Sequence, residues 1–388
     1  MALRVLVSAG EASGDLYASA LVGRLRELHP GAEFFGCAGP RMRSLGVESV
    51  VRSESLSVVG LVEVVRHIPR IYGEFRKLVR AARDRKPHVA LLTDSPDFHL
   101  RLARKLHRAG IPVIYLIAPQ VWAWRRGRVT ILEETVQRLL CIFPFEEQFF
   151  REHGVAATYI GHPLARLVRP SMTRSEFFQR NGIPEGRRPL VALLPGSRVG
   201  EVKRHIPAVA DAVARIRKTR PDCSFVCGAP PGFSSFIEVS SFWELFHRES
   251  IQVVEGITWD LLAHADVALT ASGTVTVEAA LLGTPMATFY RVSPLSWMLG
   301  RWLVRVPFLS MVNLIAGRAI VPELIQDDLT GDRLAGEALR LLNDGEASAR
   351  MRSDLREVRE MLETSEDPMD RAAREIETVL DKELVNAG

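Results

Sequence analysis

The sequence predicts an α/β protein built from two doubly wound parallel-sheet domains. Three observations support this: the length of 388 residues, the alternation of short β-branched runs with segments of helical period, and a polar stretch at 166–188 with prolines, after which the alternation restarts. Alternating strands and helices require a parallel sheet covered on both faces. We therefore expect Rossmann-like domains at 1–168 and 186–360, and a helical tail at 361–388.

Each half contains five candidate strands with helices between them. The strands expected in the first half are Arg4–Ser8, Glu33–Cys37, His88–Thr93, Val113–Ile117 and Leu139–Phe143, and the helices are Leu16–Leu28, Tyr72–Arg85, Phe98–Arg108 and Phe145–His153. In the second half they are strands Leu190–Leu194, Ser224–Cys227, Ile251–Val254, Val267–Thr270 and Met286–Phe289, and helices Val202–Lys218, Phe233–Glu249, Trp259–Ala263 and Thr274–Leu282. Ligands of such sheets bind beyond the carboxyl ends of the strands, so chemistry is expected there, in a cleft that the two domains face.

Composition and charge narrow the class of protein. Apolar residues make up 47% and charged residues 25%, as in ordinary globular proteins. The four cysteines lie mostly in apolar runs and no leader precedes the first strand, so we expect reduced thiols and a cytoplasmic location. Residues 63–128 carry 15 Lys/Arg against 5 Asp/Glu, whereas residues 331–388 carry 9 against 15. The first half should therefore attract anions: phosphates, anionic lipid headgroups or nucleic acid.

Missing motifs argue against a nucleic-acid partner and against a bound metal or cofactor. The basic region has no nucleic-acid recognition motif, and 46 acidic residues offset much of its charge, so no nucleic-acid partner is expected. HExxH, paired CxxC and EF-hand patterns are absent from the sequence, so no metal and no cofactor are expected.

The opening segment "SAGEASGDL" follows the first strand. Gly10 and Gly14 allow close backbone approach, and Ser13 or Asp15 can cap the next helix. Glu11 remains: it is either a second cap or a carboxylate that orients a sugar hydroxyl. Because a carboxylate repels phosphate, this loop is not expected to be the main phosphate site.

Two further segments follow strands of the first half. In "TDSPDF", Asp94 and Asp97 stand at a strand tip. Asp97 alone is more simply a helix N-cap, but two acids beside a basic helix favour a base that accepts a proton from an alcohol. In "VWAWRRGR", Trp122, Trp124 and Arg125 form either a half-buried strand edge or a platform for a sugar or acyl chain with a cation for phosphate.

The second half offers two anion sites at helix starts. In "LLPGSR", Gly196 and Ser197 expose backbone N–H groups and Arg198 adds a charge, which suits phosphate, although the spacing is not that of a P-loop. In "TASGTVTVE" the residues are Ser272, Gly273, Thr274 and Glu278. Here the helix start suits a diphosphate and the glutamate can accept hydrogen bonds from ribose hydroxyls; the plainer alternative is an ordinary helix with an exposed Glu.

Two stretches interleave apolar residues with cations, as membrane-surface segments do. The first contains Val62, Val64, Val65, Ile68 and Ile71 among arginines, and the second, "LSWMLGRWLVRVPFL", spans 295–309. For either stretch alone, a helix packed on the core is the simpler explanation. If the substrate is a lipid, the interpretation as a membrane-surface segment is favoured.

The segments quoted above, together with "FPFE", "GHP", "NLIAGR" and "VPELIQ", resemble the lipid-A-disaccharide synthase family in their order over nearly the whole chain. The resemblance implies the GT-B fold and an inverting glycosyltransferase that joins UDP-2,3-diacylglucosamine to 2,3-diacylglucosamine 1-phosphate (lipid X), at the cytoplasmic face of the anionic inner membrane. It also implies a final helix that packs back on the N-terminal domain, and it allows a homodimer. It places the base at Asp97, diphosphate stabilisation at Arg198 and a residue near the acceptor at Glu11, with Asn313 and Gln326 on the donor side. The chain departs from the family pattern at His99, commonly Asn, and at Val312, usually Pro.

Two other classes of function remain as alternatives. One is a related UDP-sugar enzyme, such as UDP-N-acetylglucosamine 2-epimerase or the peptidoglycan glycosyltransferase, for which "VWAWR" and the apolar-basic stretch would not be needed. The other is a non-enzymatic nucleotide-binding or membrane-surface protein. The substitution Asp97→Ala distinguishes the second class from an enzyme.

Overall fold

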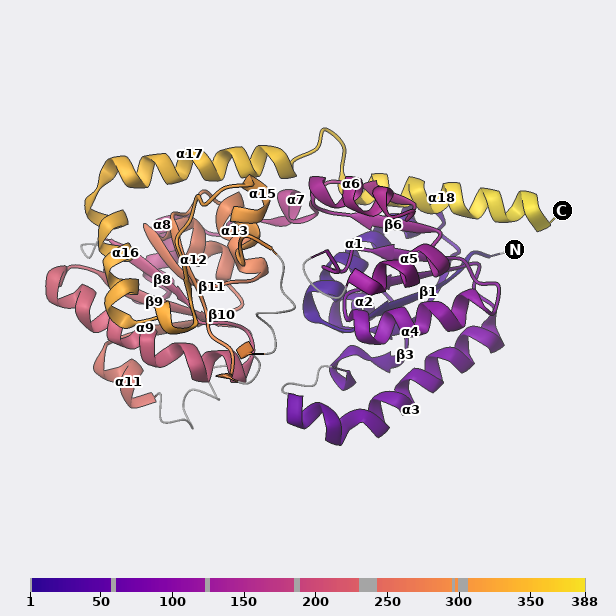
Figure 1. Ribbon diagram of the computed structural model, residues 1–388, viewed down its shortest axis with the longest axis horizontal. Coiled ribbons are helices and arrows are strands. Elements are labelled where there is room, and N and C mark those ends of the chain that lie inside the picture. The colour runs from indigo at the N-terminus through magenta and orange to yellow at the C-terminus, as the bar shows by residue number, and fades with distance from the viewer. Residues whose placement is uncertain are drawn as a thin grey trace. The chain divides into compact units, whose positions relative to one another are not determined.

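The fold was analysed in a computed structural model that describes residues 2–56, 61–122, 126–184, 189–229, 243–294, 297–298 and 306–387, without the side chains of 61–68, 126, 243 and 383–387. The chain forms two compact units. Unit 1 comprises Met1–Pro163 and Leu362–Gly388, and unit 2 comprises Leu164–Met361. Figure 1 labels helices and strands of both units.

Unit 1 is a parallel sheet whose order among the described strands is β3-β2-β1-β4-β5-β6-β7. The strands are β1 Arg4–Ala9, β2 Glu33–Ala38, β3 Glu48–Arg52, β4 Val89–Thr93, β5 Val113–Leu116, β6 Arg138–Cys141 and β7 Ala157–Tyr159. The inner strands β1, β4 and β5 are almost entirely buried, as expected when helices cover both faces. The order reverses between β1 and β4, which is the switch point of a doubly wound sheet.

Helices cover both faces of this sheet (Figure 1). They are α1 Ala12–Leu28, α2 Pro40–Ser44, α3 Leu61–Arg85, α4 Pro96–His107, α5 Val129–Thr135, α6 Pro144–Glu152 and α18 Pro368–Ala387, with 3-10 turns η1 Ser53–Ser55 and η2 Arg126–Arg128. The last helix, α18, packs on α1 and β6. Ion pairs of Arg24 with Asp370 and of Arg138 with Glu375, the latter at 2.8 Å, support this contact, as does a hydrogen bond between His29 Nε2 and Glu377 at 2.8 Å.

Unit 2 repeats the same plan with the order β10-β9-β8-β11-β12-β13 among its described strands. The strands are β8 Leu190–Leu194, β9 Ser224–Ala229, β10 Gln252–Glu255, β11 Val267–Ala271, β12 Met286–Tyr290 and β13 Glu323–Ile325. The helices are α7 Leu164–Leu167, α8 Arg174–Arg180, α9 Val199–Thr219, α11 Trp243–Arg248, α12 Thr258–His264, α13 Thr274–Leu281, α15 Met311–Ala316, α16 Gly331–Asn343 and α17 Gly345–Leu362, with the turn η3 Gln326–Asp328. The predicted class, two Rossmann-like parallel-sheet domains with a helical C-terminal region, is confirmed.

Three strands were not predicted: β3, β7 and β13. All three are the last strands at a sheet edge, and two of them have only three residues, so they lack the long apolar run that marks an inner strand. The helix predicted at Tyr72–Arg85 begins earlier, at Leu61. The apolar-basic stretch is therefore part of a single 25-residue helix. Most of the predicted helix Phe233–Glu249 lies outside the described residues, apart from α11.

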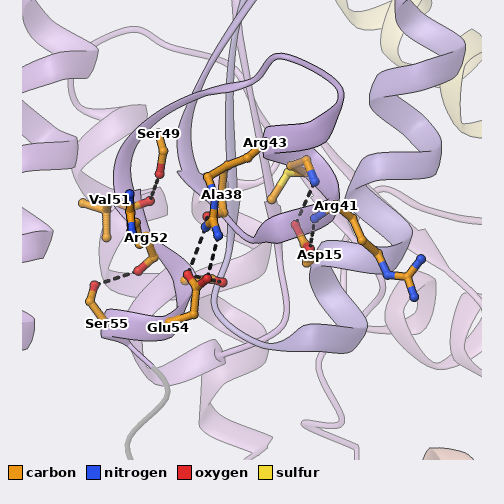
Figure 2. A network of polar contacts seen from close by, with 11 residues as sticks. Asp15, Ala38, Arg41, Arg43, Ser49, Val51, Arg52, Glu54 and Ser55 are labelled. Atoms are coloured by element: carbon orange, nitrogen blue, oxygen red, sulfur yellow. Dashed lines mark hydrogen bonds and ion pairs between the residues drawn. The ribbon is translucent and has the colours of Figure 1, made fainter. Parts of the chain in front are cut away.

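The predicted caps of the first helix were wrong. Helix α1 begins at Ala12 with Glu11 as its N-cap, so Ser13 and Asp15 lie inside its first turn. The Asp15 carboxylate instead accepts the backbone N–H groups of Arg41 at 2.9 Å and Met42 at 3.2 Å, which start α2 (Figure 2). It thereby supplies to α2 the acceptor that an N-cap side chain would provide.

Candidate active site

The carboxyl ends of β1 and β4 bring together the two acidic segments of unit 1. The β4–α4 turn places the Asp94 carboxylate under the β1–α1 loop, where it accepts the N–H of Gly10 at 2.8 Å and of Glu11 at 3.0 Å. A Cβ on Gly14 would lie 1.7 Å from Asp94 Oδ2. A Cβ on Gly10 would lie 2.4 Å from Ser95 Oγ. The close backbone approach that the sequence predicted at the two glycines therefore occurs between two protein loops.

Asp94 and Asp97 differ sharply in environment although two residues separate them. The Asp94 side chain is 12% exposed, and burial raises the pKa of its carboxyl to about 7. The Asp97 side chain is 65% exposed and pairs with Arg128, which is 15% exposed. Helix α4 starts at Pro96 after Ser95, so Asp97 is not the N-cap and that simpler interpretation is wrong. Its carboxylate is accessible at the carboxyl end of β4.

Trp122 does not form an exposed aromatic platform. The residue is 6% exposed; its ring contacts Phe145 edge-on with 5.0 Å between the ring centroids, and its Nε1 donates to Glu146 at 3.0 Å. The Glu146 carboxylate also accepts the N–H groups of Ile142 and Phe143. Burial raises the pKa of Glu146 to about 8. Trp122 thus packs the segment between β5 and η2 against the start of α6. Trp124 and Arg125 lie outside the described residues.

In unit 2, the turn after β8 carries Gly196 with φ +124°, a conformation that favours glycine, and exposed Ser197 and Arg198 precede α9. Arg198 is 53% exposed and contacts Glu201 at 3.1 Å. The turn is fixed by His205, whose Nδ1 donates to the carbonyl of Pro195 at 2.7 Å while Nε2 accepts the N–H of Arg291 at 2.9 Å. An arginine beside a helix start is a suitable site for a phosphate.

The neighbouring helix start, after β11, exposes Gly273 and Thr274 at the N-terminus of α13. The Ser272 hydroxyl donates to the carbonyl of Leu309 at 2.9 Å. One turn into α13, burial raises the pKa of Glu278 to about 7, and a hydrogen bond from the Trp259 side chain opposes that shift. The sequence predicted this grouping of small residues and a carboxylate at one helix terminus.

The two predicted donor-side amides are largely occupied by protein. Asn313 is fully buried and donates to Val321 O and Glu323 Oε1, while its oxygen accepts the N–H groups of Ile320 and Val321. Its four hydrogen-bonding positions are thus filled, so it supports the loop instead of contacting a ligand through its amide. Gln326 has φ +53°, and its side-chain oxygen accepts the N–H of Val292 at 2.9 Å.

The predicted membrane-facing residues lie on α3. The side chains of Val62, Val64, Val65 and Ile68 are outside the described part of the structure, and Ile71 is half-buried. Tyr72, 60% exposed, stacks with Phe75, which contacts Phe98 of α4. Within the described residues, no helix is both long and apolar enough to cross a bilayer, and no cluster of three potential metal ligands occurs.

Structural comparison supports the fold. The crystal structure of UDP-GlcNAc 2-epimerase from Neisseria meningitidis bound to UDP-GlcNAc aligns with a TM-score of 0.67 at 12% identity, covering 98% of this chain and 100% of that one. The glycotransferase of kitacinnamycin aligns with a TM-score of 0.63 at 18% identity, covering 97% and 98%. At these identities the likeness shows the GT-B fold alone.

Sequence comparison establishes the family. The model of the lipid-A-disaccharide synthetase family matches residues 5–376. A relative from Solibacter usitatus, lipid-A-disaccharide synthase, is 58% identical over 384 residues, covering 99% of both chains. These matches show that the chain belongs to the lipid-A-disaccharide synthase family, glycosyltransferases of lipid A biosynthesis.

Proposed function

We propose that the chain transfers 2,3-diacylglucosamine from UDP-2,3-diacylglucosamine to the 6-hydroxyl of 2,3-diacylglucosamine 1-phosphate. The products are lipid A disaccharide 1-phosphate and UDP. The observation that carries this proposal is the Asp97 carboxylate, which is 65% exposed at the carboxyl end of β4 and held by Arg128. A general base needs an accessible carboxylate in a fixed orientation, and Asp97 meets both conditions.

In the proposed reaction, the oxygen of the acceptor hydroxyl attacks the anomeric carbon of the donor, and Asp97 accepts the proton of that hydroxyl. The bond from that carbon to the diphosphate oxygen breaks, and its electron pair leaves with UDP. A single displacement of this kind inverts the configuration of the sugar carbon. Glu11 lies on the neighbouring loop, exposed, and is assigned to the acceptor side with Ser13.

Unit 2 is assigned to the donor nucleotide. We assign Arg198 and the backbone N–H groups of Gly196 and Ser197 to stabilisation of the charge on the leaving diphosphate; the exposed arginine at the start of α9 supports this assignment. The start of α13 offers a second set of N–H groups at Gly273 and Thr274. Glu278 is assigned to the ribose hydroxyls, which would donate to its carboxylate. The shared fold of the epimerase that holds UDP-GlcNAc supports a UDP-sugar as the ligand.

The substitution Asp97→Asn tests the base. We expect kcat to fall by about 10²–10⁴-fold, the usual contribution of a general base, with UDP affinity unchanged. The assay follows UDP release from UDP-diacylglucosamine with lipid X as acceptor. Glu48→Gln is the matched control, because Glu48 is also an exposed carboxylate, 61% exposed, paired with an arginine, Arg85. An Asp97→Asn enzyme as active as the control would refute the assignment.

We also propose that α3 docks unit 1 on the cytoplasmic face of the anionic inner membrane. Its charge pattern supports this: apolar positions alternate with arginines on a 25-residue helix, and Tyr72 is exposed on the same helix. Replacing Val64, Val65, Ile68 and Ile71 with Ser should release the protein from anionic vesicles without changing its melting temperature. Global unfolding of that variant would instead identify these residues as core.

A further inference from the structure

A buried carboxylate links the two acidic loops of unit 1, and neither the mechanism nor the family comparison uses it. We call the Asp94 junction the set of Gly10, Glu11, Gly14 and Asp94. Each Asp94 oxygen accepts a different backbone N–H, Oδ1 from Gly10 at 2.8 Å and Oδ2 from Glu11 at 3.0 Å. Both loops that carry exposed acids therefore depend on one side chain for their relative position.

The backbone at Asp94 is held in an unusual conformation. Asp94 and Ser95 have φ +55° and +34°, both in the left-handed region that side chains other than glycine seldom adopt. Two donors hold the Asp94 carbonyl in place, Tyr115 Oη at 2.5 Å and His99 Nδ1 at 3.0 Å. Such a conformation persists only where the surroundings over-determine it, and it occurs most often at functional sites.

His99 supports the junction as a neutral ring. It is fully buried, and burial lowers the pKa of its imidazole to about 4. Because Nδ1 donates to the Asp94 carbonyl, Nε2 is the acceptor for the Ser8 hydroxyl at 2.8 Å. Although His99 Nδ1 lies 3.7 Å from Asp94 Oδ1, a neutral ring forms no ion pair with the carboxylate. The histidine that departs from the family pattern therefore has a defined structural role.

Among the described residues, none of the groups that face the Asp94 carboxyl is a cation in direct contact with it. These groups are Glu11 on the β1–α1 loop, Cys37 on β2, Tyr115 on β5, and neutral His99 and Asp97 on α4. Asp97 is paired with Arg128. Burial is the largest influence and the Glu11 charge acts in the same direction, so the pKa of Asp94 rises to about 7. The two N–H donors act against this shift.

We propose that Asp94 is a positioning residue that sets the geometry of Glu11 and Asp97 for glycosyl transfer, and that only its ionised form does so. The ionised carboxylate accepts both N–H groups. A protonated carboxyl directs an O–H at one of them and releases one loop, so transfer slows as the pH falls. This inference rests on the proposed catalytic role of Asp97, which the Asp97→Asn measurement tests separately.

The test compares Asp94→Asn with a matched variant, Asp15→Asn. Asp15 is also a buried carboxylate that accepts two backbone N–H groups, but from α2 and not from a strand-end loop (Figure 2). Both variants should lose thermal stability. Asp94→Asn should in addition lower kcat at pH 8 by about tenfold or more, with the KM of the UDP-sugar unchanged, and the deficit should shrink toward parity at pH 6 because the wild-type group is then mostly protonated. Asp15→Asn should keep the wild-type shape of the pH profile.

A second measurement uses the wild-type protein, so it does not depend on how the variant folds. The amide protons of Gly10 and Glu11, followed by NMR, should shift together with a midpoint near pH 7 as Asp94 loses its proton. A deficit in Asp94→Asn that is equal at all pH values, or amide signals that do not titrate near pH 7, would overturn the proposal. If Asp97→Asn were fully active while the Asp94 results held, the base assignment would fail and Asp94 would still position Glu11.

Discussion

The substitution Gly14→Ala should destabilise unit 1 although it places a better helix former in helix α1. The new Cβ would lie 1.7 Å from Asp94 Oδ2 and 2.7 Å from Cγ, so it cannot be accommodated without movement. Asp94 is a short side chain whose two oxygens already accept Gly10 N–H and Glu11 N–H. Relief of the clash therefore requires either rotation of the carboxylate away from both donors or displacement of the first turn of α1.

The magnitude follows from these two routes. Overpacking in a closed site costs about 1–3 kcal/mol. Loss of a hydrogen bond to a charged group costs about 1.5–3 kcal/mol, and rotation would break two of them. The higher helix propensity of Ala relative to Gly offsets about 1 kcal/mol of this cost. Displacement then costs up to about 2 kcal/mol net and rotation about 2–5 kcal/mol net. Because the cheaper route limits the cost, we expect a net loss of about 2 kcal/mol in the free energy of unfolding, which lowers the melting temperature by about 4–8 °C for a unit of this size.

Gly23→Ala is the matched control, because Gly23 lies in the same helix and an added Cβ would meet nothing within 4 Å. It should raise stability by about 0.5–1 kcal/mol, as Ala for Gly does inside a helix. Thermal unfolding followed by circular dichroism measures both. In an Asp94→Ala background the clashing atoms are gone, so Gly14→Ala should become nearly neutral. Equal melting temperatures for Gly14→Ala and the wild type, or strict additivity in this cycle, would refute the reasoning.

Three further predictions concern buried polar groups. Asn313→Ala leaves buried N–H groups of Ile320 and Val321 without an acceptor and should lower the free energy of urea unfolding by about 2–4 kcal/mol, whereas Asn343→Ala, at an exposed position, should change it little. Burial raises the pKa of Glu146 to about 8, so the folded state binds its proton more tightly than the unfolded state; the stability that this group contributes is present at pH 5 and is lost as the pH rises to 8. The stability advantage of wild type over Glu146→Gln should therefore shrink across that range in thermal melts, and a difference independent of pH would contradict it. All four cysteines are buried, so a thiol reagent should label none in the native protein and four in urea; rapid native labelling would be inconsistent with their burial.

The inner strands could be predicted from sequence because parallel strands covered on both faces need unbroken apolar runs. Val89–Thr93 and Leu190–Leu194 show such runs, and both are fully buried. The edge strand Glu48–Arg52 carries charge at both ends, and strands of three residues contain too little pattern to detect. The edge strands that were not predicted therefore form through pairing with a neighbouring strand, which the local sequence does not reveal.

The roles of the two acids in "DSPDF" could not be separated from sequence. Both follow one strand, and only the left-handed turn at Asp94 and Ser95 decides that the first points under the β1–α1 loop while the second faces solvent. The β1–α1 loop contained a signal for the position of Asp94: two glycines four residues apart follow a strand, and the loop already contains a carboxylate. Such a loop is a poor phosphate site, and its glycines were needed to admit another acid.

The two sheets have the same strand order around the switch point, β2-β1-β4 in unit 1 and β9-β8-β11 in unit 2, yet the charges that follow their central strands are opposite. After β1 and β4 stand Glu11, Asp94 and Asp97, whereas after β8 and β11 stand Arg198 and a helix start lined by Ser272 and Thr274. An anion at the first sheet's strand ends would meet the exposed carboxylates of Glu11 and Asp97, and at the second it would meet the Arg198 guanidinium and the N-terminus of α13. The charges at equivalent positions of one fold therefore support the proposal that the diphosphate binds unit 2. In the same proposal unit 1 binds the acceptor hydroxyl, because a carboxylate can accept the proton of a hydroxyl and does not repel it.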